Sequence, residues 1–324
     1  MPSVPACNAP HGADPRFERR DARHDAWFRR LLQACALVVL LALLGAALST
    51  LWGGRDVLLG EGASFLTSAK WNPVTNHYGA LAPLFGTLVT SLIALALAVP
   101  TGFGIAVFLT EVAPAWLRRP VALAIELLAS IPSIIYGMWG LFVLVPCMAT
   151  LEPNLSATLG KLPLTGQLFR GPPLGLGILT AGIVLAVMIL PFICAVLHEV
   201  FASVPVQLKE SGHALGATTW EVTWNIVLPY TRSAVVGGIF LGLGRALGET
   251  MAVTFVLGNA YAISGSLLMP GTSISSSIAN EFNEALGMHR SALMALGFLL
   301  FAVTFAVLLL ARIMLRHLAR RGGK

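Results

Sequence analysis

Residues 233–258 read SAVVGGIFLGLGRALGETMAVTFVLG, a run of apolar and small residues that carries two charges, Arg245 and Glu249. A helix needs about 20 apolar residues to cross the ~30 Å hydrocarbon core of a bilayer, and this run is long enough. Because no water in that core can satisfy open backbone groups, a spanning segment must be a helix or part of a closed barrel. The run is continuous rather than alternating, so it predicts a transmembrane helix.

The rest of the chain repeats this pattern. Of its 324 residues, 56% are hydrophobic and only 11% are charged, whereas a soluble domain is about a quarter charged. Prolines 100, 132 and 191 fall inside apolar stretches, where we expect kinks. We therefore predict an all-α polytopic membrane protein with about six transmembrane helices. The expected spans are Leu31–Trp52, Leu81–Leu109, Val121–Ala149, Leu174–Leu197, Ser233–Gly258 and Ala292–Leu315.

Charge position predicts the orientation of these spans. Fifteen Lys and Arg residues fall in the head, the second–third and fourth–fifth connections and the tail, against five in the other connections. The positive-inside rule then places both termini in the cytoplasm. We expect a basic cytoplasmic head at 1–30, a six-helix domain at 31–315 and a basic cytoplasmic tail at 316–324. The first run could also be a cleaved secretion signal, but it is longer than a usual signal core, which favours a retained span.

Several catalytic and binding motifs are missing. The sequence holds no GxxxxGK[ST], so we expect no phosphate-cradling nucleotide site, and it holds no HExxH or GxSxG. None of the seven histidines lies in the middle of a predicted span, which argues against a metal site or an intramembrane proton relay. We expect neither an enzyme nor a cofactor-binding chain. The net charge of +6 indicates membrane orientation rather than a nucleic-acid partner.

The connection at 198–232 is longer than a turn needs and is amphipathic. It reads ESGHALG at Glu210–Gly216 and, nine residues later, IVLP at Ile226–Pro229. This pattern predicts two short helices that meet near Gly216, where glycine accepts a positive φ, with Pro229 stopping the second helix. Such a helix can dock into a groove of a soluble partner, or it can rest on lipid headgroups.

This connection resembles the EAA loop of ABC importer permeases, which reads Glu-Ala-Ala, three residues, Gly, nine residues, Ile-x-Leu-Pro. Ser211 and Gly212 depart from the two alanines, and both are small. The resemblance implies a coupling helix seated on an ATPase subunit. The positions that match in register are Glu210, Gly216, Ile226, Leu228 and Pro229.

Arg245 is the most unusual residue of the fifth span. A charge near the bilayer centre costs about 2.5–3.5 kcal/mol on insertion scales, so it indicates a function by default. Glu249 lies four residues on, so the two side chains can pair. Gly238 and Gly242 continue the stripe and permit close helix approach, as do Gly244 and Gly248. The alternatives are an internal ion pair that joins helices and a guanidinium that lines an anion path, with Glu249 holding it or accepting from a protonated oxyanion.

Four stretches resemble the PstC permeases of bacterial phosphate-specific transport systems. They are PTGFGIAVFLTE at 100–111, IELLASIPSIIYG at 125–137, GLGRALGETMAV at 242–253 and MPGTSISSSIANEF at 269–282. The sister permease is similar at Arg-Ala-x-Gly-Glu-Thr, but the Met-Ala-Val continuation favours the C subunit. The resemblance implies a type I ABC importer permease fold, a bacterial inner-membrane location and Arg245 and Glu249 as transport-critical residues, with Glu126 and Thr250 as further candidates.

The same resemblance implies a function and partners. The chain would form half of an inorganic phosphate pathway, beside a PstA-like sister permease. A PstB-like ATPase dimer would carry ATP and Mg²⁺, and a PstS-like external protein would deliver phosphate. Alternatives are a permease for another oxyanion, such as phosphonate or molybdate, an ion-coupled secondary transporter, and a membrane scaffold or sensor. The secondary transporter predicts inverted repeats and broken helices, which the sequence does not display.

Overall fold

The structure is a computed structural model that describes residues 15–161 and 166–322. The chain divides into two units, 1–49 and 50–324. The first unit is built on helix α1 (Pro15–Gly53), whose apolar part contains the predicted first span. Residues 1–14 of the predicted head, Cys7 among them, and residues 323–324 of the predicted tail lie outside the described residues.

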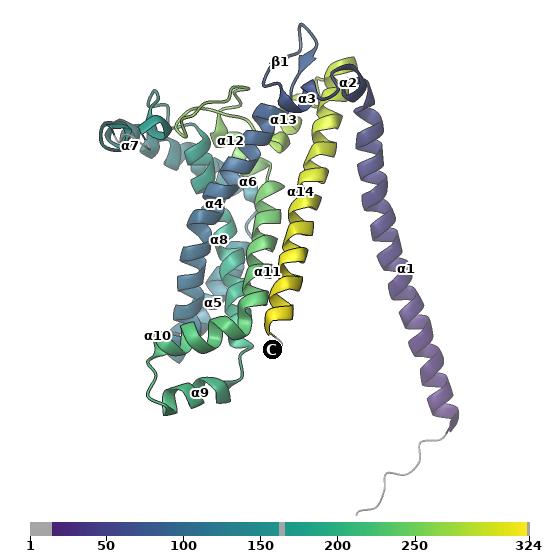
Figure 1. Cartoon of the computed structure of the whole chain (residues 1–324), viewed down its shortest axis with the longest axis vertical. Coiled ribbons are helices and arrows are strands. Elements are labelled where there is room, and N and C mark those ends of the chain that lie inside the picture. The colour runs from purple at the N-terminus through teal and green to yellow at the C-terminus, as the bar shows by residue number, and fades with distance from the viewer. Residues whose placement is uncertain (1–14, 162–165, 323–324) are drawn as a thin grey trace, which may run out of the picture. The chain divides into compact units, whose positions relative to one another are not determined.

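The second unit is a helical bundle with one small hairpin (Figure 1). Strands β1 and β2 pair antiparallel, with Trp71 opposite Tyr78. The elements of the unit are α2 (Arg55–Gly60), α3 (Ser64–Thr67), β1 (Trp71–Asn72), β2 (His77–Tyr78), α4 (Leu81–Val107), η1 (Phe108–Val112), α5 (Ala115–Ala129), α6 (Ser133–Trp139), η2 (Gly140–Leu144), α7 (Val145–Thr158), η3 (Leu159–Lys161), η4 (Gly166–Phe169), α8 (Ile178–Ala202), α9 (Val206–Ala214), α10 (Thr219–Val222), η5 (Thr223–Val227), α11 (Leu228–Leu247), α12 (Met251–Leu257), α13 (Ile274–Glu281) and α14 (Gly287–Gly322).

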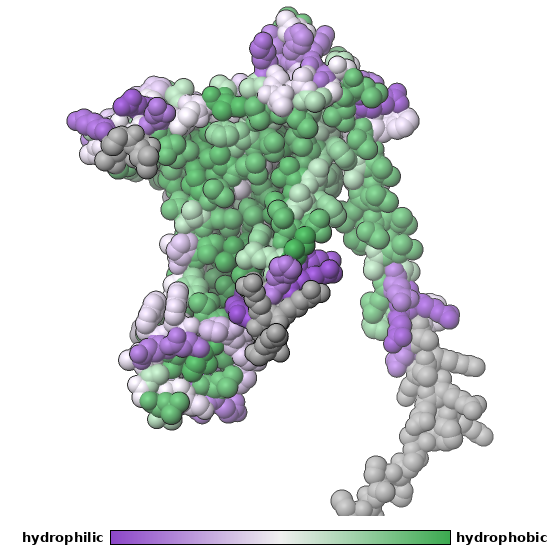
Figure 2. Space-filling view, viewed as in Figure 1, coloured by the Kyte–Doolittle hydropathy of each residue, from purple (hydrophilic) through white to green (hydrophobic). Residues whose placement is uncertain are grey.

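Six helical segments in the described part of the chain are long and apolar enough to cross a membrane. This confirms the predicted number of spans. In the second unit, hydrophobic residues cover the middle of the bundle and hydrophilic ones gather at its two ends (Figure 2). We call these the hairpin end, which carries β1 and β2, and the α9 end, which carries α9 and α10.

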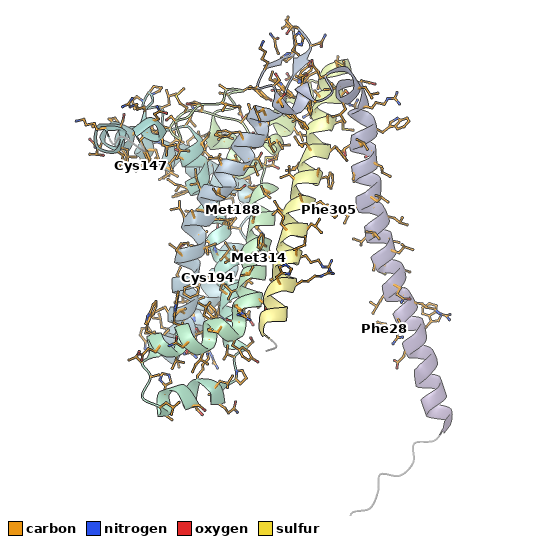
Figure 3. All side chains as sticks on the ribbon, in the orientation of Figure 1. Phe28, Cys147, Met188, Cys194, Phe305 and Met314 are labelled. Carbon is orange, nitrogen blue, oxygen red and sulfur yellow. The ribbon has the colours of Figure 1, made fainter. Side chains whose placement is uncertain are left out.

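Helix α8 is the centre of this bundle. It is the most buried of the six candidate spans, with 67% of its apolar window inside the protein. Leu185, Ile189 and Ile193 are fully buried on it, and α4, α11 and α12 pack around it. Pro100 and Pro191 lie inside the continuous helices α4 and α8, so neither interrupts its span. Figure 3 labels Met188 and Cys194 on α8, and Cys194 is a buried free thiol.

The prediction of one continuous helix at 121–149 is wrong. Helix α5 ends at Ala129, and α6 begins at Ser133 with Pro132 as its N-cap. Proline disfavours the α conformation in the residue before it, which here is Ile131, so the helix stops there. Ala122 and Ile125 of α5 line a pocket with Cys194 and His198, whereas Gly140 of η2 lies against Val184. Helix α5 and the α6–η2 segment therefore contact different parts of α8, and the third candidate span of the structure is Ser133–Lys161 rather than 121–149.

The fifth span is broken as well. Helix α11 ends at Leu247 and α12 begins at Met251, so Gly248, Glu249 and Thr250 form a non-helical step. We predicted no broken helices from the sequence, whereas the described part of the chain contains two. Pro229 was expected to stop the helix of the docking loop, but the helical run continues from Thr219 to Leu247. The π-helical turn η5 lies just before Pro229. Its wider hydrogen-bond pattern accommodates the N–H that proline lacks and leaves room between the proline ring and the carbonyl one turn earlier.

A polar cluster fixes the hairpin end. Glu281 of α13 accepts hydrogen bonds from Nε1 of Trp71 (2.9 Å) and from the hydroxyl of Tyr261 (2.6 Å), and its Oε2 lies 2.7 Å from Nε2 of His289. The Trp71 and Tyr261 rings stack at 4.8 Å. Burial raises the pKa of Tyr261, and its bond to Glu281 raises it further, so the phenol stays protonated and donates.

Candidate functional site

Arg245 lies in the last turn of α11, and its side chain is exposed on the surface of the chain. The guanidinium carbon lies 5.5 Å from the centre of the Phe192 ring on α8, a cation–π contact. An arginine on a spanning helix that is not sealed among helices can face a route through the protein. Its donors can reach a planar or tetrahedral anion.

Arg245 and Glu249 do not form the predicted ion pair among the described residues. The i,i+4 geometry needs a continuous helix, and α11 ends two residues before Glu249. Glu249 is half-buried, and its Oε1 accepts the backbone N–H of Ala252 at 3.3 Å, in the first turn of α12. The hydroxyl of Ser275 donates to the carbonyl of Glu249 at 2.6 Å. The carboxylate is therefore held at the helix break rather than by the arginine.

The two helix breaks belong to one region of the bundle. A Cβ on Gly137 of α6 would lie 3.0 Å from the Cα of Ala252 on α12, so the half-helices that follow the breaks pack closely. The hydroxyl of Tyr136 donates to the carbonyl of Leu128 at 2.8 Å, so it joins α6 to the end of α5 across the first break. Sequence reasoning missed Tyr136 and Ser275, because the bonds they make exist only once the breaks form.

The two further site candidates, Thr250 and Glu126, lie in different parts of the bundle. Thr250 is half-buried at the N-cap of α12, beside Glu249, and so belongs to the same break. Glu126 is exposed on α5 and lines a separate pocket with His198 and Glu199 of α8. The structure thus brings Arg245, Glu249 and Thr250 together and leaves Glu126 in a pocket whose lining does not include them.

The glycines of the fifth span face two different surroundings: some pack on α8 and one faces open space. A Cβ on Gly238 would lie 2.8 Å from Cγ1 of Val196, and one on Gly242 would lie 2.9 Å from Ile193, so this pair seats α11 on α8. Gly244 has nothing within 4 Å of a built Cβ, and it lies on the open side with Arg245. The first small-xxx-small pair therefore packs inside the chain, and the residue that opens the second faces outward.

The loop at 198–232 has the predicted two-helix form. Helices α9 and α10 meet at Gly216, whose φ of +87° is a conformation that glycine adopts without strain. Thr218 and Glu221 form a capping box that starts α10. Of the matched positions, Glu210 and Pro229 are exposed, whereas Ile226 and Leu228 are half-buried. Val222 and Val227 are fully buried and anchor the second helix on the bundle.

The α9 end presents large apolar side chains to the outside. Leu215 is 89% exposed beside the Gly216 turn, and Trp220 and Trp224 are 64% and 51% exposed. The two indole rings stack, with 5.6 Å between their centres. Exposed apolar residues at the end of a bundle, away from its apolar middle, are the feature expected of a docking surface for another protein or for lipid.

The described residues contain no group of three or more His, Cys, Asp and Glu side chains that could hold a metal ion. Cys35, Cys147 and Cys194 are free thiols. The charged groups of residues 233–258 are the guanidinium of Arg245 and the carboxylate of Glu249. A guanidinium can hold an oxyanion by hydrogen bonds.

Comparisons with known proteins identify relatives. The family model described as the inner membrane component of binding-protein-dependent transport systems matches residues 98–322. A protein of Xylella fastidiosa described as phosphate transport system permease protein PstC is 65% identical over 305 residues, 94% of each chain. The protein of the same description in Pasteurella multocida is 55% identical over 298 residues, 92% of this chain and 93% of its own.

Solved structures share the fold. One chain of a bacterial alginate ABC transporter, crystallised with a periplasmic protein bound to an alginate pentasaccharide, superposes with a TM-score of 0.59 at 19% identity, covering 91% of this chain and 96% of its own. A chain of the MetNI methionine ABC transporter in an inward-facing conformation superposes with a TM-score of 0.51 at 18% identity, covering 74% and 94%. These structures support the ABC importer permease fold.

Proposed function

This chain belongs to the PstC family of phosphate transport system permease proteins, and from that premise we propose that phosphate crosses the membrane beside Arg245 and Glu249. The chain is a multi-pass inner-membrane protein and the permease subunit of a phosphate ABC importer, not itself a catalytic enzyme. It works with partner subunits of an ABC transporter.

The exposed position of Arg245 carries the proposal. Keeping a guanidinium in a spanning helix costs about 2.5–3.5 kcal/mol, and no carboxylate in the described part of the chain pairs with it to offset that cost. The cation–π contact with Phe192 holds the guanidinium near α8 and uses none of its N–H donors. Those donors bind tetrahedral oxygens two at a time and never deprotonate, which suits phosphate at any physiological pH.

Glu249 supplies the second element of recognition. Its carboxylate is fixed by the Ala252 N–H and its carbonyl by Ser275, so it is oriented without the arginine. A carboxylate accepts a hydrogen bond from a protonated phosphate oxygen, whereas it repels an oxyanion that carries no proton. This favours hydrogen-bearing phosphate over sulfate-like ions. Thr250 can add a hydroxyl at the same break, and Glu126 lies in its own pocket and is a weaker candidate.

The partners follow from the two ends of the bundle. A PstA-like sister permease would complete the pathway opposite Arg245. A PstB-like ATPase dimer would hold ATP and Mg²⁺, since this sequence lacks a phosphate-cradling loop, and would dock on Glu210, Gly216, Ile226, Leu228 and Pro229 and the exposed indoles. A PstS-like protein would deliver phosphate at the hairpin end, with the α9 end and both termini in the cytoplasm.

ATP-driven phosphate uptake by vesicles that hold the whole complex tests this proposal. We expect Arg245→Gln to abolish uptake while the subunits still assemble. Arg290→Gln is the matched control, because Arg290 also lies 5.5 Å from a phenylalanine ring, that of Phe282 at the hairpin end. Uptake at the wild-type rate by Arg245→Gln would exclude the pathway, and loss of assembly would favour a structural role. Competition by phosphonate or molybdate would separate the oxyanion alternatives.

A further inference from the structure

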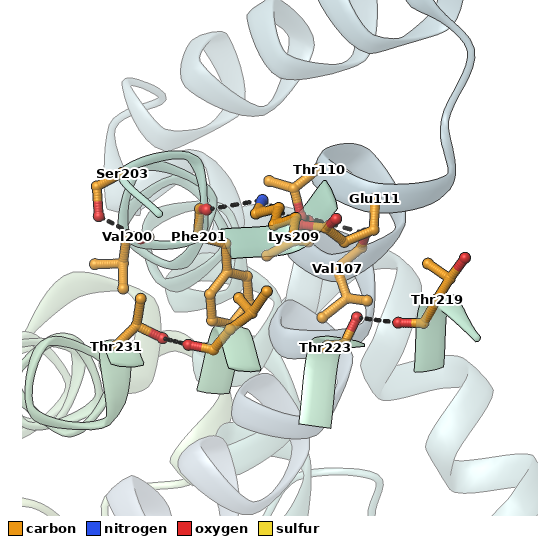
Figure 4. A network of polar contacts seen from close by, with 12 residues as sticks. Val107, Thr110, Glu111, Val200, Phe201, Ser203, Lys209, Thr219, Thr223 and Thr231 are labelled. Atoms are coloured by element: carbon orange, nitrogen blue, oxygen red, sulfur yellow. Dashed lines mark hydrogen bonds and ion pairs between the residues drawn. The ribbon is translucent and has the colours of Figure 1, made fainter. Parts of the chain in front are cut away.

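A buried ion pair connects α9 to the end of the second span. Nζ of Lys209 lies 2.6 Å from Oε1 of Glu111, and the two side chains are only 16% and 8% exposed. Figure 4 shows the lysine reaching from α9 toward η1, the π-helical turn that ends the helical run from Leu81 to Val112. Turns of this kind occur frequently at functional sites. The two residues are 98 positions apart, so the sequence gives no signal of their contact.

The same lysine also holds α8. Its Nζ donates to the carbonyl of Phe201 at 3.3 Å, in the last turn of that helix (Figure 4). Helix α8 carries Phe192, on which the Arg245 guanidinium stacks. A displacement of α9 would thus act, through one side chain, on the ends of both α4 and α8. The latter is a continuous helix that leads to the proposed phosphate site.

The apolar side of α9 packs against a different element, the α10–η5 helix. Gly212 of α9 lies against Ile226 and Val222, so α9 and the α10–η5 helix form one packed unit, the part of the chain that an ATPase would contact. The Lys209–Glu111 pair extends beyond this unit to a different helix. It is placed to carry motion from the docking unit into the spans.

Energetics favour a linking role over a stabilising one. A buried ion pair is weak evidence for stability, because the cost of desolvating both charges offsets their attraction. Replacing such a pair by apolar residues of similar size often leaves the folding stability unchanged or higher. An ion pair does add a geometric restraint, because a short charge-assisted hydrogen bond fixes the relative position of the two bonded atoms. Removing one partner leaves the other charge buried and alone, which breaks the link decisively.

We propose that the Lys209–Glu111 pair is a mechanical link, beside the continuous helical run Thr219–Leu247, that couples ATP hydrolysis to phosphate movement in this importer, an inference that rests on the function proposed above. When the ATPase subunits move α9, the pair pulls the ends of α4 and α8 with it. Both residues are positioning residues: neither touches phosphate, and they act through the end of the second span and through α8, the helix that carries Phe192.

The test measures phosphate imported per ATP hydrolysed, in vesicles that hold the complete complex. We expect Lys209→Met and Glu111→Gln to lower this ratio roughly tenfold or more, a typical size for coupling between sites, while ATP hydrolysis and subunit assembly persist. The exchange Lys209→Glu with Glu111→Lys should restore part of the ratio, because it rebuilds the pair between α9 and η1 but not the bond to the Phe201 carbonyl. Lys209→Met with Glu111→Met should not, because it fills the space without a directional bond.

Two results would overturn the link. The first is a wild-type ratio in either single variant, and the second is full recovery in the double methionine variant, which would show that the pair only fills space. Lys70→Met, which removes an exposed lysine before β1, controls for the loss of a charge. Arg245→Gln in the same vesicles tests the pathway separately. If it imports phosphate normally, the site proposal fails while the ratios of the Lys209 variants still report on coupling.

Discussion

Gly212 lies where the apolar faces of α9 and of the following helical run meet. A Cβ at this position would lie 2.6 Å from Cδ1 of Ile226 and 3.1 Å from Cγ2 of Val222. The sequence indicated only that a small residue is needed, since Gly212 replaces an alanine of the EAA pattern. The structure explains the glycine: in this chain a methyl group would force Ile226 to move its Cδ1 and would crowd Val222.

Gly212→Ala should therefore destabilise the docking segment although alanine is the better helix former. Overpacking by a methyl group typically costs about 1–3 kcal/mol, which outweighs the gain of up to ~1 kcal/mol in helix propensity. We expect a lower thermal midpoint and weaker retention of the ATPase subunits on purification. Gly212→Ala combined with Ile226→Val removes the clashing Cδ1 and should recover most of the loss. Equal stability of the single and double variants would contradict this account.

The two helix breaks are the elements on which the candidate site depends. A break inside a span opens backbone carbonyls that lipid cannot satisfy, so side chains must satisfy them. Ser275 does so for Glu249, whose carboxylate in turn caps α12, and Tyr136 joins the two sides of the other break through Leu128. The position of Glu249 is thus set by bonds from two elements, α12 and α13.

Ser275→Ala tests this arrangement. Ser275 is 6% exposed, so no water readily replaces the lost hydroxyl, and an unsatisfied buried carbonyl costs about 1–3 kcal/mol. We expect Glu249 to lose its fixed position, which would raise the phosphate concentration needed for half-maximal uptake more than it lowers the maximal rate. Ser203→Ala is the control, because its hydroxyl also donates to a backbone carbonyl but is exposed. An unchanged concentration dependence would show that Ser275 is not a positioning residue.

At the scale of the whole molecule, hydropathy was enough to predict six spans, and a short motif was enough to predict the two-helix form of the loop at 198–232 with Gly216 at its bend. The predictions that assumed a continuous helix were wrong. The Arg245–Glu249 pair required a helix that stops at Leu247, and the third span required a helix through Pro132. Long-range contacts such as Lys209–Glu111 depend on how α4, α8 and α9 pack, which no local pattern encodes.

Charge is distributed unevenly between the two ends of the second unit, and this predicts its orientation. In this unit nine Lys and Arg residues fall in 110–120, 198–232 (which contains α9) and 312–324, against five in 53–80 (which contains the hairpin), 150–173 and 259–291. Short connections rich in Lys and Arg stay in the cytoplasm. The α9 end should therefore face the cytoplasm, where ATP is available, and the hairpin should face the external binding protein.

Cysteine labelling in cells decides the orientation. In a chain whose four natural cysteines are replaced by serine or alanine, Val74→Cys in the hairpin turn, a position 90% exposed, should react with a membrane-impermeant thiol reagent added outside spheroplasts. Leu215→Cys, at a position 89% exposed beside the Gly216 turn, should react only after the membrane is opened. Because the two positions are equally accessible in the isolated chain, a difference in labelling reports the membrane alone. The reverse pattern would place the docking loop outside and remove any role for a cytoplasmic ATPase at it.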